Sequence, residues 1–253
     1  MKLTIVGSGT AAPTPERVCS GYFVEAGDDR LLLDCGAGVV HGMARLGLPW
    51  DALDHLLITH FHNDHIGDLP MLLFALEHGV RPKREKPLSI WAPHGIGERL
   101  RAMEAAFGAH VADPGFPVAI REVVPGDEFE VGPLAVRAVS TPHTEESLAY
   151  RLEAEDGILG YTGDTGPSAE VARVLAGVDV LIAECSLPDD EAIPTHLSPT
   201  SLAAMAADAA PGRLVVTHVY PQLEALDPVA RVRAAGWKGE TVRAEDGRTV
   251  RIP

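Results

Sequence analysis

Cysteine and long apolar runs are scarce in this chain of 253 residues. Its three cysteines, Cys19, Cys35 and Cys185, are an odd number without the spacing of a zinc knuckle, so we expect reduced thiols in a cytoplasm. No segment approaches the roughly 20 apolar residues that span a bilayer. The start of the chain is too short and too polar for a signal peptide. These absences predict a cytoplasmic protein with no membrane partner.

Positive charge is also in short supply. The chain has 21 lysines and arginines but 36 aspartates and glutamates, which gives a net charge of −15. Affinity for nucleic acids comes largely from basic residues on phosphates, so this balance disfavours binding of a large RNA. A small phosphate substrate stays compatible, because bound metal ions can dominate the local field. The basic run Arg81–Lys86 could steer a phosphate, but a charge run is usually a solvated surface, and we favour that interpretation.

Apolar material, by contrast, suffices for a large core. Hydrophobic residues make up 46% of the chain and charged residues 23%, which is ordinary for a globular protein. Short apolar runs bounded by turn residues alternate with helical patterns, and no linker, repeat or low-complexity tract interrupts them. We therefore expect a single domain of the α/β class, residues 1–253, with helices outside two packed sheets.

The expected elements are defined by residue. Strands are predicted at Lys2–Val6, Gly21–Glu25, Leu31–Asp34, His55–Thr59, Leu88–Ala92, Ala119–Val123, Glu128–Val131, Leu134–Ser140, Leu148–Glu153, Ile158–Thr162, Val180–Glu184 and Leu214–Thr217. Helices are predicted at Val39–Leu46, Leu69–Leu76, Glu98–Phe107, Ala169–Leu175, Pro199–Ala209 and Pro228–Ala234. The strands between residues 119 and 162 should form an antiparallel run, and a hairpin turning at Asp246 and Gly247 should end the chain.

Four side chains able to bind metal fall within six residues: His60, His62, Asp64 and His65. Alternate residues of an extended segment point the same way, so His60 and His62 can reach one metal ion. Asp64 and His65 follow as the chain turns and can reach a second ion. Imidazole suits zinc and its neighbours, and the carboxylate adds a harder ligand. The cluster predicts a metal site more strongly than a structural role for three histidines.

This segment resembles the metallo-β-lactamase superfamily, and the resemblance covers nearly the whole chain. Asp34, in Leu-Asp-Cys-Gly, matches the first motif of the family and the histidine cluster matches the second. His143 in Thr-Pro-His-Thr, Asp164 in Thr-Gly-Asp-Thr and His218 in Val-Thr-His match the remaining three. The resemblance implies a four-layer αβ/βα sandwich with two metal ions in a groove at one edge.

The resemblance also implies which residues hold the metals. His60, His62 and His143 bind one ion, Asp64, His65 and His218 bind the other, Asp164 bridges them, and Asp34 supports the histidines. Zinc is the default metal, with manganese and iron as alternatives for this ligand set. Two ions would lower the pKa of a bridging water, and Asp64 would orient it for attack. Taken alone, His143 or His218 would more often be a core histidine, and only the whole pattern favours ligands.

A narrower resemblance is to the ribonuclease Z-like branch of the superfamily. The opening loop Gly7–Pro13, followed by Arg17, looks like that of the branch. Glu184, in Ala-Glu-Cys-Ser, and His196, in Thr-His-Leu-Ser, match a pair that acts beside the metals. There the histidine contacts the phosphate or protonates the leaving oxygen and the glutamate orients it, which suits a group that titrates near neutral pH. The alternative is a helix-entry histidine and a strand-end carboxylate.

One departure from the branch bears on the substrate. Ribonuclease Z carries a long arm that grips transfer RNA between the residues matching His143 and Asp164, and here only twenty residues separate them. The chain therefore resembles the armless relatives that cleave small or cyclic phosphodiesters, and we expect no transfer RNA partner. Three alternatives stay open: a hydrolase of lactones, thioesters or β-lactams, a transfer RNA 3′-processing endonuclease, and a metal-binding protein without turnover. A homodimer is also left open.

Overall fold

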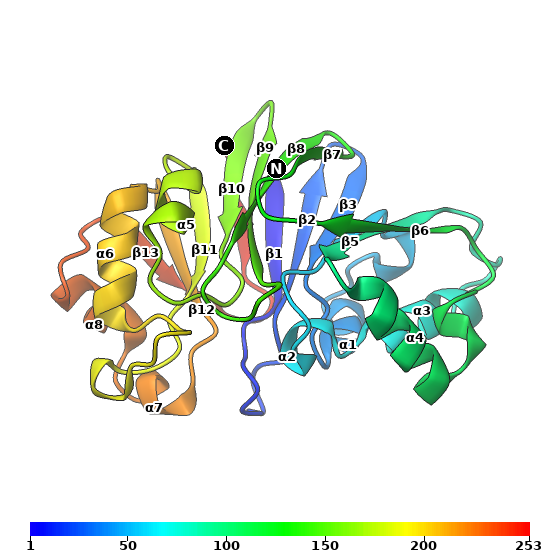
Figure 1. The fold of residues 1–253 in the computed structure, drawn as a ribbon, viewed down its shortest axis with the longest axis horizontal. Coiled ribbons are helices and arrows are strands. Elements are labelled where there is room, and N and C mark those ends of the chain that lie inside the picture. Colours follow the sequence, from blue (N-terminus) through cyan, green and yellow to red (C-terminus); the bar gives the residue numbers. More distant parts are fainter.

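Two seven-stranded sheets face each other in the computed structural model, which describes residues 1–253 (Figure 1). The first sheet contains, in spatial order, β14 (Thr249–Arg251), β1 (Lys2–Gly7), β2 (Gly21–Ala26), β3 (Asp29–Leu33), β4 (His55–Leu57), β5 (Leu88–Pro93) and β6 (Val118–Val123). The second contains β13 (Glu240–Arg243), β12 (Arg213–Thr217), β11 (Val180–Glu184), β10 (Gly157–Tyr161), β9 (Leu148–Ala154), β8 (Leu134–Ser140) and β7 (Glu128–Val131).

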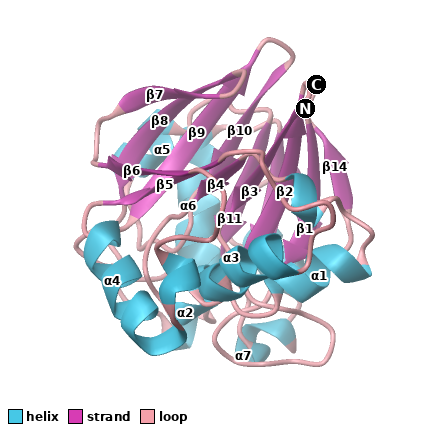
Figure 2. Ribbon diagram, turned by 90° about the vertical axis from the view of Figure 1, so that its right-hand side faces the viewer, coloured by secondary structure: helices cyan, strands magenta, loops and turns pink.

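Helices cover the outer face of each sheet. The helices on the side of the first sheet are α1 (Val39–Arg45), α2 (Asn63–Ile66), α3 (Leu69–His78) and α4 (Ile96–Phe107). Those on the side of the second are α5 (Ala169–Val174), α6 (Pro199–Ala209), α7 (Pro221–Glu224) and α8 (Pro228–Ala234). Figure 2, seen from the side of α3 and α4, shows these helices in front and α6 on the far side of the sheets. The predicted four-layer α/β sandwich is confirmed.

Three apolar cores separate the four layers. In β3, Leu31 and Leu33 face the second sheet, whereas Leu32 packs under the helices of the first half. In β12, Val215 faces the first sheet, and its neighbours Leu214 and Val216 pack under α5 and α6. Successive side chains of a strand point to opposite faces, so strands covered on both faces need continuous apolar runs. The inter-sheet core therefore holds the two halves rigidly against each other.

Two of the predicted strand pairings are wrong. β6 pairs in parallel with β5 in the first sheet, so the antiparallel run contains only β7 to β10. The expected terminal hairpin does not form, because β13 pairs with β12 in the second sheet and β14 pairs with β1 in the first. The Asp246 carboxylate accepts hydrogen bonds from the backbone N–H groups of Ser8 and Val18, so the turn segment anchors the opening loop while the chain crosses between sheets.

The strands deliver their carboxyl ends to one edge of the sandwich. Segments that follow β3, β4, β8, β10, β11 and β12 carry Asp34, the predicted metal ligands and His196, and these segments meet there. The longest helix, α4, has 12 residues, and no helix combines the length and apolar character that crossing a membrane requires.

Candidate metal centre

The structure brings the seven predicted metal ligands together. His60 and His62 follow β4, Asp64 and His65 lie on α2, His143 follows β8, Asp164 follows β10, and His218 follows β12. They form two groups, within each of which the potential ligand atoms lie no more than 4.8 Å from one another. The first contains His60, His62, His143 and Asp164, and the second contains Asp64, His65 and His218.

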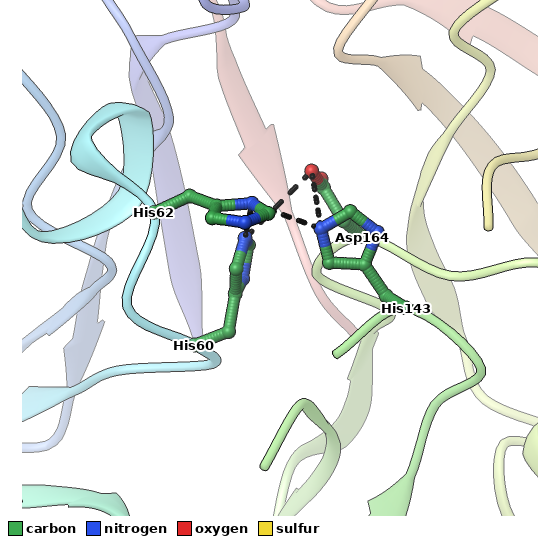
Figure 3. A group of neighbouring side chains, drawn as sticks. All are labelled: His60, His62, His143 and Asp164. Atoms are coloured by element: carbon green, nitrogen blue, oxygen red, sulfur yellow. Dashed lines mark hydrogen bonds and ion pairs between the residues drawn. The ribbon is translucent and has the colours of Figure 1, made fainter. Parts of the chain in front are cut away.

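In the first group, three imidazoles converge with one carboxylate (Figure 3). His62 Nδ1 lies 3.1 Å from His60 Nε2 and 3.0 Å from His143 Nε2. Asp164 Oδ2 lies 3.8 Å from His60 Nε2 and 3.7 Å from His143 Nε2. Three nitrogens and an oxygen that face one another so closely are the donor set of a zinc-type site.

Asp164, a member of the first group, also lies close to two members of the second. His218 Nε2 lies 3.2 Å from Asp64 Oδ2 and 3.6 Å from Asp164 Oδ2, and His65 Nε2 lies 3.2 Å from Asp164 Oδ1. His65 Nε2 and Asp164 Oδ1 are buried but lack the alignment of a hydrogen bond, so neither has a partner. Buried polar atoms without partners are costly, and a divalent cation between them would satisfy both. The residues present therefore fit a metal ion.

The charges of the cluster suit cation binding. Burial alone would raise the pKa of Asp164, but His218 and His65 hold it well below its usual range. Burial and the neighbouring His65 lower the pKa of His60 well below its usual value. Burial would also lower the pKa of His65, but Asp164 and Asp34 outweigh it and raise that pKa well above its usual value. A cation bound at His65 would compete with protonation of the ring, because a metal ligand must be deprotonated.

Asp34 holds the segment from Thr59 to His65, which supplies the ligands from the first half of the chain. Its buried carboxylate accepts hydrogen bonds from the Thr59 backbone N–H (2.7 Å), the Thr59 hydroxyl (2.8 Å) and the Tyr161 hydroxyl (2.6 Å), and it lies 2.7 Å from His65 Nδ1. This geometry places Asp34 in contact with the predicted ligand His65 and with Thr59, which directly precedes His60. Its left-handed backbone, with φ of 57°, costs about 1–3 kcal/mol, and such strain persists only where the surrounding structure enforces it.

Close backbone packing holds α2 against the segment after β3. The N–H of Cys35 donates to the carbonyl of His65 at 2.7 Å. A Cβ atom at Gly36 would lie 2.0 Å from the carbonyl oxygen of Asp64, so only glycine allows this approach. The short motif around Asp34 and the histidine cluster are therefore one packed unit.

Glu184 organises the second half. It is fully buried at the end of β11, and its Oε1 lies 2.8 Å from His196 Nδ1 and accepts a hydrogen bond from the Thr165 N–H at 2.7 Å. Its Oε2 accepts hydrogen bonds from the Ser186 hydroxyl at 2.6 Å and from the Leu197 N–H at 3.2 Å. Four partners saturate both oxygens, so this carboxylate is fixed in place.

His196 stands beside the metal cluster. Its ring centroid lies 4.7 Å from that of His143 and 5.8 Å from that of His218, and its side chain is 13% exposed. Burial would lower the pKa of His196, but the hydrogen bond and charge of Glu184 outweigh burial and raise it. Because Nδ1 faces Glu184, Nε2 is the atom available to a substrate. His196 also lies close enough to Asp164 and His218 to form a third group of potential ligands with them, so the alternative role of His196 is that of a metal ligand.

Sequence reasoning missed the residues that hold the ligands. Thr59 precedes the cluster directly, Ser186 follows Glu184 by two positions, and Tyr161 comes three before Asp164. Hydroxyl residues so near predicted ligands are a usable signal for Thr59 and Ser186. Tyr161 gave no signal, because it is separated from Asp34 by 127 positions and meets it only through the packing of the two sheets.

The basic run differs from the predicted solvated surface at one position. Arg84 is buried and donates hydrogen bonds to the carbonyls of Asp51, Leu53 and Pro87, so the expectation is wrong for this residue. A guanidinium offers five donors and can satisfy several carbonyls of a loop at once. Lys86 is partly exposed and pairs with Asp54 at 2.5 Å. Arg81, Lys83 and Glu85 are exposed, as predicted.

Comparison with known proteins agrees with the fold and with a metal-dependent hydrolase. Residues 29–219 match the family model described as the beta-lactamase superfamily domain. The chain belongs to this superfamily and is a metal-dependent hydrolase. Within the superfamily it belongs to the ribonuclease Z-like branch.

Individual relatives define that branch. The ribonuclease Z of Mycobacterium sp. (strain KMS) is 32% identical over 96% of this chain and 90% of the relative. The ribonuclease Z of Halorubrum lacusprofundi is 29% identical over 100% of this chain and 97% of the relative. That alignment runs over 309 positions, so the relative has segments that a chain of 253 residues lacks.

Solved structures match over the full length. The metallo-beta-lactamase fold protein YhfI from Bacillus subtilis has a TM-score of 0.85 and 24% identity, with 98% of both chains covered. The short form of human tRNase Z (ELAC1) has a TM-score of 0.81 and 25% identity, with 100% of both chains covered. The first of these likenesses concerns the fold alone.

Proposed function

We propose that this protein, as a single domain of residues 1–253, hydrolyses small or cyclic phosphodiesters with the help of two divalent metal ions. The observation that carries the proposal is the pair of Glu184 and His196 beside the metal cluster, with Nδ1 of the histidine 2.8 Å from the buried carboxylate. Hydrolysis of a phosphodiester expels an alkoxide, which needs a proton or a charge partner. We further propose that the enzyme works in the cytoplasm, where its three free cysteines stay reduced.

The metal ligands in this proposal are those of the two groups. His60, His62 and His143 hold one ion, Asp64, His65 and His218 hold the other, and Asp164 bridges them, which its distances of 3.2 Å from His65 Nε2 and 3.6 Å from His218 Nε2 support. Zinc is the first choice for a site rich in imidazole, and manganese and iron are the alternatives. When bound, the ions supply Lewis acidity that activates water and neutralises charge on the phosphate.

The side chains of the site divide the remaining work. Asp64, whose Oδ2 lies 3.2 Å from His218 Nε2, faces the cluster and orients the attacking water. His196 carries a proton on Nε2 when charged, and its hydrogen bond to Glu184 fixes the direction of the ring. As the bond from phosphorus to the leaving oxygen breaks, this proton passes to that oxygen. A positioned acid of this kind is worth about 10²–10⁴-fold in rate.

A screen of substrates tests the proposal directly. The metal-loaded protein would be assayed against 2′,3′-cyclic nucleotides, linear diesters, lactones, thioesters and a β-lactam. Phosphodiesters should give the highest kcat/KM. Faster turnover of a lactone or thioester would overturn the proposal in favour of a carbonyl hydrolase. If the protein binds metal but turns over none of these substrates, a metal-binding protein without catalytic activity would be favoured.

Transfer RNA processing is a second candidate, because the relatives are named ribonuclease Z. Two features argue against it. The twenty residues between His143 and Asp164 are taken up by β9, β10 and short turns, which leaves no arm. The net charge of −15 repels a large polyanion. A transfer RNA precursor should therefore be cleaved far more slowly than a small diester, and specific cleavage at nanomolar enzyme that rivals the small diesters would contradict this prediction.

A further inference from the structure

A threonine hydroxyl lies between Asp34 and the metal-facing histidine His60. The hydroxyl of Thr59 donates to Asp34 Oδ2 at 2.8 Å, and the same oxygen lies 3.1 Å from His60 Nδ1. All three residues are buried, with at most 1% of Thr59 exposed. A hydroxyl has one proton and two lone pairs, so an oxygen that has given its proton to Asp34 can only accept from Nδ1–H.

A serine hydroxyl occupies the equivalent position in the second half. The hydroxyl of Ser186 donates to Glu184 Oε2 at 2.6 Å, and its oxygen lies 3.0 Å from His218 Nδ1. The carbonyl of His218 is a competing acceptor at 3.1 Å. A short bond to an ionised carboxylate is about twice as strong as one to a neutral acceptor, so the proton goes to Glu184. The serine oxygen is then left to accept from His218 Nδ1–H.

The two halves therefore contain the same connection of carboxylate, hydroxyl and imidazole. Each carboxylate also has an imidazole as a direct partner, which is His65 for Asp34 and His196 for Glu184. His196 Nδ1 lies 3.3 Å from Ser186 Oγ, farther than its 2.8 Å from Glu184, so the serine is left to serve His218. Outside the site, neither hydroxyl has any partner that would explain its burial.

We propose that Thr59 and Ser186 are positioning residues that hold His60 and His218 in the Nδ1–H tautomer and aim their unprotonated Nε2 atoms at the metal ions. Partners of the distal ring nitrogen fix the tautomer and raise the basicity of a histidine ligand. Because His60 and His218 belong to different groups, each hydroxyl serves one ion. This inference rests on the metal ligands of the proposed function.

A metal-binding titration with a competing chelator tests the two hydroxyls separately. Zinc binding would be followed in wild type, Thr59→Val and Ser186→Ala. Each variant should bind one of the two ions about 10–100-fold more weakly and keep the other, since loss of such a partner typically has this effect. Glu184→Gln should weaken binding of the same ion as Ser186→Ala does, because the hydroxyl of Ser186 donates its hydrogen bond to the Glu184 carboxylate.

Conservative variants and a distant serine serve as controls. Thr59→Ser and Ser186→Thr keep a hydroxyl and should restore zinc affinity to within a few-fold of wild type, which a purely steric role would not predict. Ser168 caps α5 by accepting a hydrogen bond from the Val171 N–H at 3.2 Å, away from the cluster. Ser168→Ala removes a hydroxyl hydrogen bond of comparable kind and should leave zinc affinity unchanged.

Histidine tautomers can also be measured in the unaltered protein by long-range ¹H–¹⁵N NMR of the zinc-loaded enzyme. His60 and His218 should each show a protonated Nδ1 and a metal-bound Nε2. Protonated Nε2 on either residue, or wild-type zinc affinity for both ions in Thr59→Val and Ser186→Ala, would overturn the inference. A wild-type protein that binds no zinc would instead refute the metal site of the proposed function, so the two failures are distinguishable.

Discussion

The two halves of the molecule contribute to the metal centre in different ways. The first half supplies four ligands from a single segment of six residues, His60 to His65, at the end of β4. The second half supplies His143, Asp164 and His218 from the ends of three strands spread over 76 residues. A compact motif can be recognised in the chain itself, whereas a dispersed one becomes a site only when the sheet aligns its strand ends.

The two halves also resemble each other in how a buried carboxylate holds the imidazoles, and they differ in one of the imidazoles that is held. Each has a buried carboxylate that holds imidazoles, and each has a non-glycine residue in the left-handed region, Asp34 with φ of 57° and His218 with φ of 52°. Both imidazoles served by Asp34 belong to predicted metal ligands. Glu184 holds His196 as well, which is outside the predicted ligand set. In the proposed function, the first half therefore only binds metal, whereas the second half also supplies His196 for the chemistry.

The largest effect should follow loss of the residue that joins the halves. Asp164→Ala removes the proposed bridging carboxylate and leaves five histidines facing one another, of which only His62 is exposed. It should lose both metals or nearly all activity. Metal analysis and kcat/KM on a chromogenic diester would be measured together. Normal turnover by this variant would show that the bridging assignment is wrong.

Removal of the proposed acid of the second half, His196, should have the next largest effect. His196→Ala should lower turnover of diesters with alkyl leaving groups by about 10²–10⁴-fold and retain both metals. The deficit should shrink for bis-p-nitrophenyl phosphate, because p-nitrophenolate departs without a proton. Metal loss would make His196 a ligand or a structural residue, and parental rates on alkyl diesters would remove the main support for the phosphodiesterase proposal.

The supporting carboxylate of the first half should matter for metal affinity more than for chemistry. Asp34→Asn keeps the shape but turns an amide N–H₂ toward donors such as the hydroxyls of Thr59 and Tyr161. Metal affinity should fall by about 10–100-fold, and the free energy of unfolding should fall by about 1–3 kcal/mol. At saturating metal, the dependence of the rate on the leaving group should equal that of wild type. A changed dependence would contradict the division of labour between the halves.

The contrast also explains what the sequence could predict. The cluster at His60, the packed motif at Asp34 and the layered fold follow from local patterns and a family resemblance. By contrast, β14 pairs with β1, β13 with β12, and β6 in parallel with β5. A local sequence pattern does not encode which strand becomes the neighbour in the sheet. Thr59 and Ser186 escaped notice because hydroxyl residues are common at strand ends and gain a role only beside a carboxylate and an imidazole.

The number of metal ions bound per chain is the direct test of the dinuclear site, because both halves are needed for two complete ligand sets. Protein purified without chelators would be analysed for zinc, manganese and iron, and its activity would be followed as metal is removed and restored. We expect two metal ions per chain and loss of activity when they are removed. A reproducible single ion per chain in fully active enzyme would contradict the dinuclear site.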